Sequence, residues 1–224
     1  MFKDRETAVI ICAGGIGKRM DAGKPKQFIE MESGVSILRK SVDAFRRGAV
    51  EGVADVIVVT APEGFEEETE ELVNAGADGL KAEVIAGGEE RQDSVVLALR
   101  HLKENGFNDG GIVLIHDGAR PFVTEEVILG VLRAAYESKA AVAAVPVKDT
   151  IRDIESGTLD RSRLYSVQTP QGFAFGLIYE AAEQALADGA RVTDDGSLAE
   201  RAGVMPEIVE GSYSNIKITT PEDL

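Results

Sequence analysis

The feature that most constrains this chain is the stretch from residue 8 to residue 28, AVIICAGGIGKRMDAGKPKQF. It opens with a short apolar run, residues 8–12, which predicts a buried strand. Gly14, Gly15 and Gly17 follow, and glycine lets the backbone turn tightly and approach a ligand closely. Four cations lie close behind: Lys18, Arg19, Lys24 and Lys26. Because such a turn presents N–H groups to an anion that the cations neutralise, the pattern indicates a polyphosphate site.

Two common phosphate-binding motifs do not fit this stretch. A Walker A loop needs Ser or Thr after its Gly-Lys pair, but Arg19 stands there. A dinucleotide fingerprint needs a third glycine where Met20 stands, which disfavours a nicotinamide-dependent oxidoreductase. The alternative without function is a plain strand-to-helix turn with solvated basic residues. Pro25 stiffens the approach to Lys26 and favours the functional interpretation.

Size and charge narrow the functional class. The 224 residues can bury a substantial core, and no repeat, low-complexity tract or linker divides them. A formal net charge of −15 argues against binding to nucleic acid or anionic membranes, which repel an acidic protein. No apolar run approaches the ~20 residues of a membrane helix. Cys12 is the only cysteine, so no intrachain disulfide can form, and we expect a cytoplasmic protein with Cys12 as a core residue.

Apolar runs and helical spacings alternate along the chain. Strands are expected at 8–12, 53–60, 83–86, 111–115, 141–147, 207–210 and 214–219, and helices at 37–45, 66–74, 91–102, 125–136, 175–187 and 193–203. Residues 148–168 differ, since their polar alternation without a helical stripe predicts strands outside the main core. We therefore expect one α/β domain, residues 1–224, with a Rossmann-like, doubly wound, mainly parallel sheet and an inserted β-arm at 148–168.

Two more strand ends carry residues suited to a ligand. The glycine turn at 87–88 offers backbone N–H groups, but Glu89 and Glu90 would repel phosphate, so it suits a base or ribose. Asp117 follows the most apolar strand, where open α/β sheets bind ligands, and it is a candidate Mg²⁺ ligand or substrate contact. The alternative is a turn or N-cap aspartate. Arg120 either pairs with Asp117 or binds phosphate, and His116 is expected to be a packed residue rather than a base.

Polar side chains of the arm and its flank form a further group. They are candidates to hold a second substrate: Thr150, Arg161 and Thr169.

The motifs together resemble a known family. AGGIGKRM with PKQ is similar to the signature of nucleotidyltransferases that join a nucleoside triphosphate to a phosphorylated sugar or polyol. GGEERQDSV, HDGARPF, PVKDT, DRSRLYSVQTPQ, TDDGS, VEG and NIKIT follow in the order found in the 2-C-methyl-D-erythritol 4-phosphate cytidylyltransferase family. This resemblance covers nearly the whole chain. It implies the nucleotide-diphospho-sugar transferase type of fold and transfer of CMP from CTP to 2-C-methyl-D-erythritol 4-phosphate, in non-mevalonate isoprenoid biosynthesis.

The resemblance also implies roles for individual residues. The catalytic set comprises the transition-state stabilisers Arg19 and Lys26 and the residues that position the polyol phosphate, Arg161 and Lys217. Those implied to bind CTP, largely through backbone groups, are Ala13, Gly14, Gly15, Gly88, Glu89 and Ser94. Those implied to contact the second substrate are Arg120, Thr150 and Thr169, with Asp117 at Mg²⁺. The family further implies a homodimer in which the arm completes the neighbour's site.

Two features depart from the family pattern, and two alternative functions stay open. Glu89 stands where an aspartate is common, and the chain stops at residues 221–224, where family members usually continue into a terminal helix.

A ribitol 5-phosphate cytidylyltransferase would differ in the pocket that recognises the polyol. A non-catalytic nucleotide-binding regulatory module would keep the fold but would not need all four cations of the catalytic set.

Overall fold

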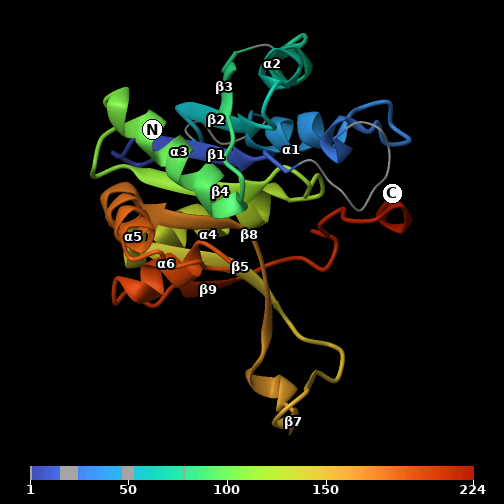
Figure 1. Cartoon of the computed structure of the whole chain (residues 1–224), viewed down its shortest axis with the longest axis vertical. Coiled ribbons are helices and arrows are strands. Elements are labelled where there is room, and N and C mark those ends of the chain that lie inside the picture. The colour runs from blue at the N-terminus through green and yellow to red at the C-terminus, as the bar shows by residue number, and fades with distance from the viewer. Residues whose placement is uncertain (1, 16–24, 47–52, 78) are drawn as a thin grey trace.

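The protein is described by a computed structural model that covers residues 2–15, 25–46, 53–77 and 79–224. Its centre is a seven-stranded sheet in the order β3-β2-β1-β4-β8-β5-β9 (Figure 1). The strands are β1 Thr7–Cys12, β2 Val56–Ala61, β3 Ala82–Ala86, β4 Ile112–Asp117, β5 Ala140–Pro146, β8 Tyr165–Ala174 and β9 Glu207–Glu210. Strand β8 runs antiparallel to both neighbours, and the other pairings are parallel. The predicted mainly parallel α/β sheet is confirmed.

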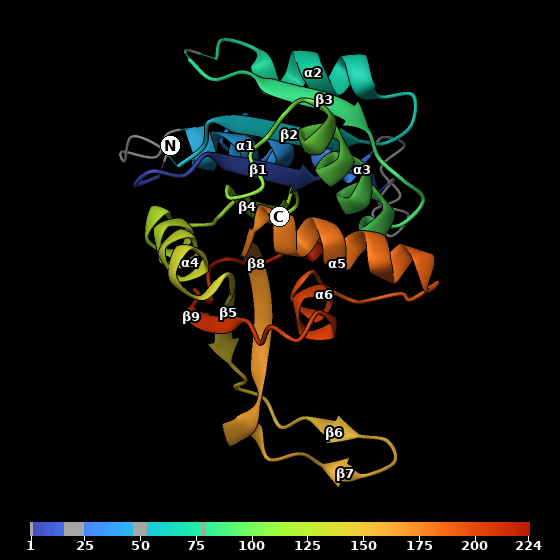
Figure 2. The same ribbon diagram turned by 90° about the vertical axis from the view of Figure 1, so that its left-hand side faces the viewer.

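Helices cover both faces of this sheet (Figure 2). They are α1 Ile37–Arg46, α2 Glu66–Asn74, α3 Arg91–Glu104, α4 Glu125–Ser138, α5 Phe175–Ala187 and α6 Gly196–Arg201. Because successive strand side chains point to opposite faces, Val9 and Ile11 join the core under α1 and α4. Ala8 and Ile10 instead join the core under α3 and α5. This two-sided burial explains why the strands are short, continuous apolar runs.

The C-terminal part differs from the prediction in two places. The strand predicted at 214–219 is wrong. Among the residues described, this segment makes a turn (Asn215 N–H to Ser212 C=O) and then one backbone bond, from Ile218 N–H to Ala119 C=O. Helix α6 begins at Gly196 rather than at 193. Asp194 still accepts a hydrogen bond from the backbone N–H of Ser197 in its first turn, at 3.2 Å.

The polar arm extends away from the sheet as a separate small hairpin (Figures 1 and 2). It contains β6 Arg152–Asp153 and β7 Gly157–Thr158, which pair only with each other. The last residues of the predicted arm, 165–168, already belong to β8, where Tyr165 pairs with Pro146 of β5. Ile154 at the tip is 98% exposed, so this chain provides no core for the hairpin in the described structure.

Three short 3-10 helices complete the described structure: η1 Lys26–Phe28, η2 Arg161–Arg163 and η3 Pro221–Asp223. None of the helices in the described residues is both long and apolar enough to span a bilayer.

Candidate active site

A cavity of about 340 Å³ lies at the carboxyl ends of β1, β3 and β4. Parallel strands end at the same edge of a sheet, so the segments that follow them meet there. Nine residues with predicted roles line it: Ala13, Gly14, Gly15, Lys26, Gly88, Glu89, Ser94, Asp117 and Lys217. The structure therefore brings together all six predicted nucleotide-binding residues, both predicted catalytic lysines and the predicted metal ligand.

The two glycine turns pack against each other to form one wall of the cavity. A Cβ atom on Gly87 would lie 2.9 Å from the Ala61 carbonyl oxygen and 3.0 Å from the Gly14 Cα. Ser94 links the turns to α3, since its Oγ accepts a hydrogen bond from the Gly88 N–H at 3.0 Å. Close backbone approach thus requires glycine at 14 and 87.

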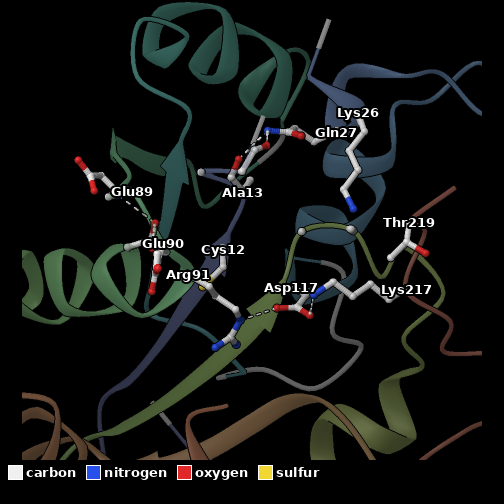
Figure 3. A pocket seen from close by; sticks show the side chains of 16 residues that line it. Cys12, Ala13, Lys26, Gln27, Glu89, Glu90, Arg91, Asp117, Lys217 and Thr219 are labelled. Atoms are coloured by element: carbon white, nitrogen blue, oxygen red, sulfur yellow. Dashed lines mark hydrogen bonds and ion pairs between the residues drawn. The ribbon is translucent and has the colours of Figure 1, made fainter. Parts of the chain in front are cut away.

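The segment that follows the undescribed residues 16–24 is held against the first turn. The Gln27 side-chain amide donates to the carbonyl oxygens of Ala13 (2.6 Å) and Gly15 (3.1 Å). Lys26 Nζ donates to the Ile218 carbonyl at 2.7 Å, which ties η1 to the C-terminal segment. Figure 3 shows Lys26 and Lys217 on the same side of the cavity. Two ammonium groups from distant parts of the chain therefore line the same cavity as the glycine turns.

Asp117 lies between two cations at the floor of the cavity (Figure 3). Its Oδ1 accepts from Arg91 Nε and its Oδ2 pairs with Lys217 Nζ, each at 2.8 Å. Arg120 Nε lies 3.8 Å from Oδ2. Burial by itself would raise the pKa of Asp117, but the charges of Arg91 and Lys217 outweigh it and hold that pKa well below its usual range. Asp117 is therefore an ionised carboxylate at neutral pH.

Arg91 is held from its other side by Asp195. Nη1 and Nη2 donate to the two carboxylate oxygens of Asp195 at 2.9 Å and 2.7 Å. Burial by itself would lower the pKa of Arg91, but the charge of Asp195 outweighs it and raises that pKa. Asp195 is only 1% exposed, so Arg91 neutralises a carboxylate that water cannot reach.

His116 and Thr169 form a closed hydrogen-bond chain behind Asp117. Burial lowers the pKa of His116 to about 4, so its ring is neutral. His116 Nε2 lies 3.1 Å from the Arg120 carbonyl, which can only accept, so Nδ1 accepts from the Thr169 hydroxyl at 3.0 Å. The same hydroxyl accepts from the Asp117 N–H at 3.0 Å. The hydroxyl of Thr169 is thus engaged within the protein, and His116 is a packed residue as predicted.

A second cavity of about 420 Å³ adjoins the first and shares Arg91, Asp117 and Lys217 with it. Arg120 and Thr169 line this second cavity. Arg120 Nη1 donates to the Asn215 carbonyl at 2.7 Å, while its buried Nε makes no hydrogen bond to a described residue. The two shared cations therefore stand where a ligand in one cavity would face a ligand in the other.

The remaining predicted residues lie elsewhere. Thr150 and Arg161 line neither cavity; they belong to the arm, where Arg161 donates to the Lys148 carbonyl. Arg19 falls outside the residues that the structure describes. Cys12 reaches the cavity wall, and burial raises the pKa of its thiol to about 12, so it is not a thiolate.

Sequence reasoning missed three residues that hold the site together. Gln27 belongs to the PKQ motif, for which the sequence predicts no separate role, although an amide beside Lys26 is a signal that the sequence contains. The sequence predicts Arg91 only as the start of a helix and Asp195 only as a residue of the helix expected at 193–203, whereas the structure pairs them. Their pairing joins positions 104 residues apart, which no local pattern reveals.

A doubly wound α/β sheet with a glycine-walled, lysine-lined cavity at its carboxyl edge is typical of enzymes that bind nucleotides. Comparison with known proteins refines this class. The sequence model of the 2-C-methyl-D-erythritol 4-phosphate cytidylyltransferase family matches residues 7–224. This chain belongs to that family, which confirms the predicted resemblance.

Individual relatives match this chain over nearly its full length. The chain is 44% identical to the 2-C-methyl-D-erythritol 4-phosphate cytidylyltransferase of Bacillus cytotoxicus, covering 96% of this chain and 93% of that one. The enzyme of the same name from Halalkalibacterium halodurans is also 44% identical (98% and 94% covered).

Solved structures are similar as well. The same enzyme from Thermus thermophilus has a TM-score of 0.77 at 34% identity, covering 97% of this chain and 95% of that one. The 4-diphosphocytidyl-2C-methyl-D-erythritol synthase of Anaerococcus prevotii has a TM-score of 0.82 at 32% identity (98% and 92% covered). The predicted type of fold is thereby confirmed.

Proposed function

We propose that this protein transfers CMP from CTP to 2-C-methyl-D-erythritol 4-phosphate, giving 4-diphosphocytidyl-2-C-methyl-D-erythritol and pyrophosphate. The single observation that carries the proposal is the cavity in which the two glycine turns meet Lys26, Lys217 and Asp117, in a chain of the cytidylyltransferase family. A CTP molecule in this cavity would place its phosphates beside backbone N–H groups and two ammonium groups.

The chemistry of this transfer matches the residues present. The attacking group is a phosphate oxygen that is already anionic, so the reaction needs no general base. The site agrees, since both ring nitrogens of His116 are hydrogen-bonded within the protein and Cys12 is not a thiolate. What the reaction needs is neutralisation of two approaching anions and of the departing pyrophosphate. We assign this to Lys26 and Lys217, with Arg19 and Arg161 in the roles that the family resemblance implies.

The site also fits a magnesium ion, although the residues described could not enclose one alone. The described part of the chain contains no group of three or more His, Cys, Asp or Glu side chains placed to hold a metal. Mg²⁺, however, commonly binds through one carboxylate together with substrate phosphates and water. Asp117 would provide that carboxylate. Its two oxygens pair with Arg91 and Lys217, but each keeps a further lone pair that could bind the metal. Bound there, Mg²⁺ would shield the triphosphate charge.

The arm supports a shared-site homodimer. Arg161 and Thr150 belong to a hairpin that has no core of its own and lies outside both cavities of its own chain. A twofold partner would cover the hairpin and receive these side chains at its second cavity. The single domain over residues 1–224 would then act as a dimer in the cytoplasm, on CTP and a polyol phosphate.

The experiment that tests the proposed function is the initial rate of pyrophosphate release from CTP and Mg²⁺, with and without 2-C-methyl-D-erythritol 4-phosphate. We expect release only when the polyol phosphate is present. CTP binding without any release would instead indicate a nucleotide-binding module. Faster release with ribitol 5-phosphate would assign the chain to that acceptor.

A further inference from the structure

Asp195 occupies the N-cap position of α6, but its side chain does not cap the helix. It immediately precedes α6, at the N-cap, where an aspartate side chain ordinarily accepts a hydrogen bond from the first turn of the helix. Here its side chain makes no capping bond, and the neighbouring Asp194 accepts from Ser197 N–H instead. The carboxylate of Asp195 is turned toward Arg91. Asp194 therefore caps the helix, and the carboxylate of Asp195 binds Arg91 instead.

The consequence of this bond is visible in the geometry of Arg91. The guanidinium is planar, and three of its nitrogens are used: Nη1 and Nη2 on Asp195, and Nε on Asp117. A planar fork that is fixed by two bonds to one carboxylate can present its Nε in only one direction. Asp195 thus determines where the Nε of Arg91 points, and Asp117 lies there.

The chain of ion pairs continues beyond Asp117 to a residue of the proposed reaction. Lys217 Nζ pairs with the second oxygen of Asp117 at 2.8 Å. Lys217 is partly exposed and lines both cavities, whereas Asp195 is buried and lines neither. Four parts of the chain meet in this series: the residue before α6, the start of α3, the end of β4 and the C-terminal segment.

We propose that Asp195 is a positioning residue of the transfer reaction: it fixes Arg91, which fixes Asp117 and, through it, the ammonium of Lys217 between the two cavities. This inference rests on the proposed function. Asp195 touches neither cavity, so its loss removes no contact with CTP. Misplacement of a reacting or stabilising group by about 1 Å can cost as much as a hundredfold in rate. The effect should therefore fall on kcat.

The test compares Asp195→Asn with a matched control, Glu183→Gln. Glu183 also makes a two-bond pair with an arginine of α3, since Arg100 Nε and Nη2 donate to its carboxylate at 2.6 Å and 2.8 Å. It lies on α5 and lines neither cavity. We expect Asp195→Asn to lower kcat about tenfold or more, with the KM for CTP changed less than about threefold. Glu183→Gln should keep the wild-type kcat.

A double variant separates positioning from general support of the fold. If Asp195 acts through Lys217, Asp195→Asn in a Lys217→Met background should add less than about twofold to the loss caused by Lys217→Met alone. If Asp195→Asn does not fold by circular dichroism, Arg91→Lys replaces it in the same cycle, since an ammonium cannot form the fork. Fully multiplicative losses, or a kcat for Asp195→Asn equal to that of Glu183→Gln, would overturn the inference. Inactive wild-type protein would overturn the proposed function itself, and the inference with it.

Discussion

The substitution Gly88→Ala tests the close packing of the cavity wall against the first turn of α3. A Cβ atom at this position would lie 2.4 Å from the Asp93 Cβ and 3.0 Å from its carbonyl carbon. These atoms belong to the first turn of α3, so the start of the helix must move. The movement strains a capping box in which Asp93 Oδ2 accepts from the Glu90 N–H at 3.1 Å.

The size of the effect follows from these contacts. Overpacking of this kind costs about 1–3 kcal/mol, and a disturbed cap costs about 0.5–2 kcal/mol. We expect the free energy of unfolding of Gly88→Ala to fall by about 2 kcal/mol. For a domain of this size that corresponds to a decrease in Tm of about 4–8 °C.

The matched control is Gly15→Ala, in the neighbouring turn. A Cβ atom there meets no atom of the residues that the structure describes within 4 Å, and the backbone is not in the left-handed region. Its free energy of unfolding should stay within about 0.5 kcal/mol of the wild-type value. Because Gly15 lines the cavity, its methyl group should still raise the KM for CTP.

The assay is urea unfolding followed by far-UV circular dichroism, without nucleotide, because a ligand that binds the folded state would mask the difference. The slope m should be equal in all three proteins, so that the midpoints report stability. A Gly88→Ala variant as stable as Gly15→Ala would refute the close packing of Gly88 against the first turn of α3.

Three further predictions concern the chemistry. Lys26→Ala should lower kcat about a hundredfold with little change in CTP affinity, because Lys26 is assigned to stabilising the transition state. A loss of CTP affinity with an unchanged kcat in steady-state assays would contradict this role. EDTA should abolish activity, and added Mg²⁺ should restore it. The Asp117→Asn variant should need a higher Mg²⁺ concentration for its half-maximal rate; a Mg²⁺ titration equal to that of the wild type would mean that Asp117 has a substrate-contact or purely structural role. Mixing Lys26→Ala with Arg161→Ala under subunit exchange should restore about a quarter of wild-type activity, since half the dimers then carry one intact site. No recovery after confirmed exchange would place Arg161 in the site of its own chain.

Much of the fold was accessible from local patterns, and strand β8 shows where they fail. Its second half contains the segment TPQGF, residues 169–173, with a proline and a glycine, which are disfavoured in strand interiors. The structure gives the reason for each. A Cβ atom on Gly172 would lie 2.9 Å from both Leu114 Cδ2 and Val131 Cγ1, so α4 packs there only against glycine. Pro170 lies opposite the irregular register between Val142 and Ala144 of β5.

The site was predictable to the extent that it lies at strand ends. Asp117 and both glycine turns could be placed because parallel strands converge at one edge. The pairing of Arg91 with Asp195 could not, because it depends on the insertion of β8 beside β4 and on how α5 and α6 then cross the same face. Likewise, polar alternation predicts a hairpin at 148–168 but cannot say which surface covers it.

The most direct test of the central claim is the identity of the product. Purified protein should be incubated with CTP, Mg²⁺ and equal concentrations of 2-C-methyl-D-erythritol 4-phosphate and ribitol 5-phosphate, and the mixture followed by ³¹P NMR. We predict one pyrophosphate for each CTP consumed, together with the diphosphate-linked cytidyl product of the methylerythritol phosphate alone. Unchanged CTP, or a product formed mainly from ribitol 5-phosphate, would contradict the account.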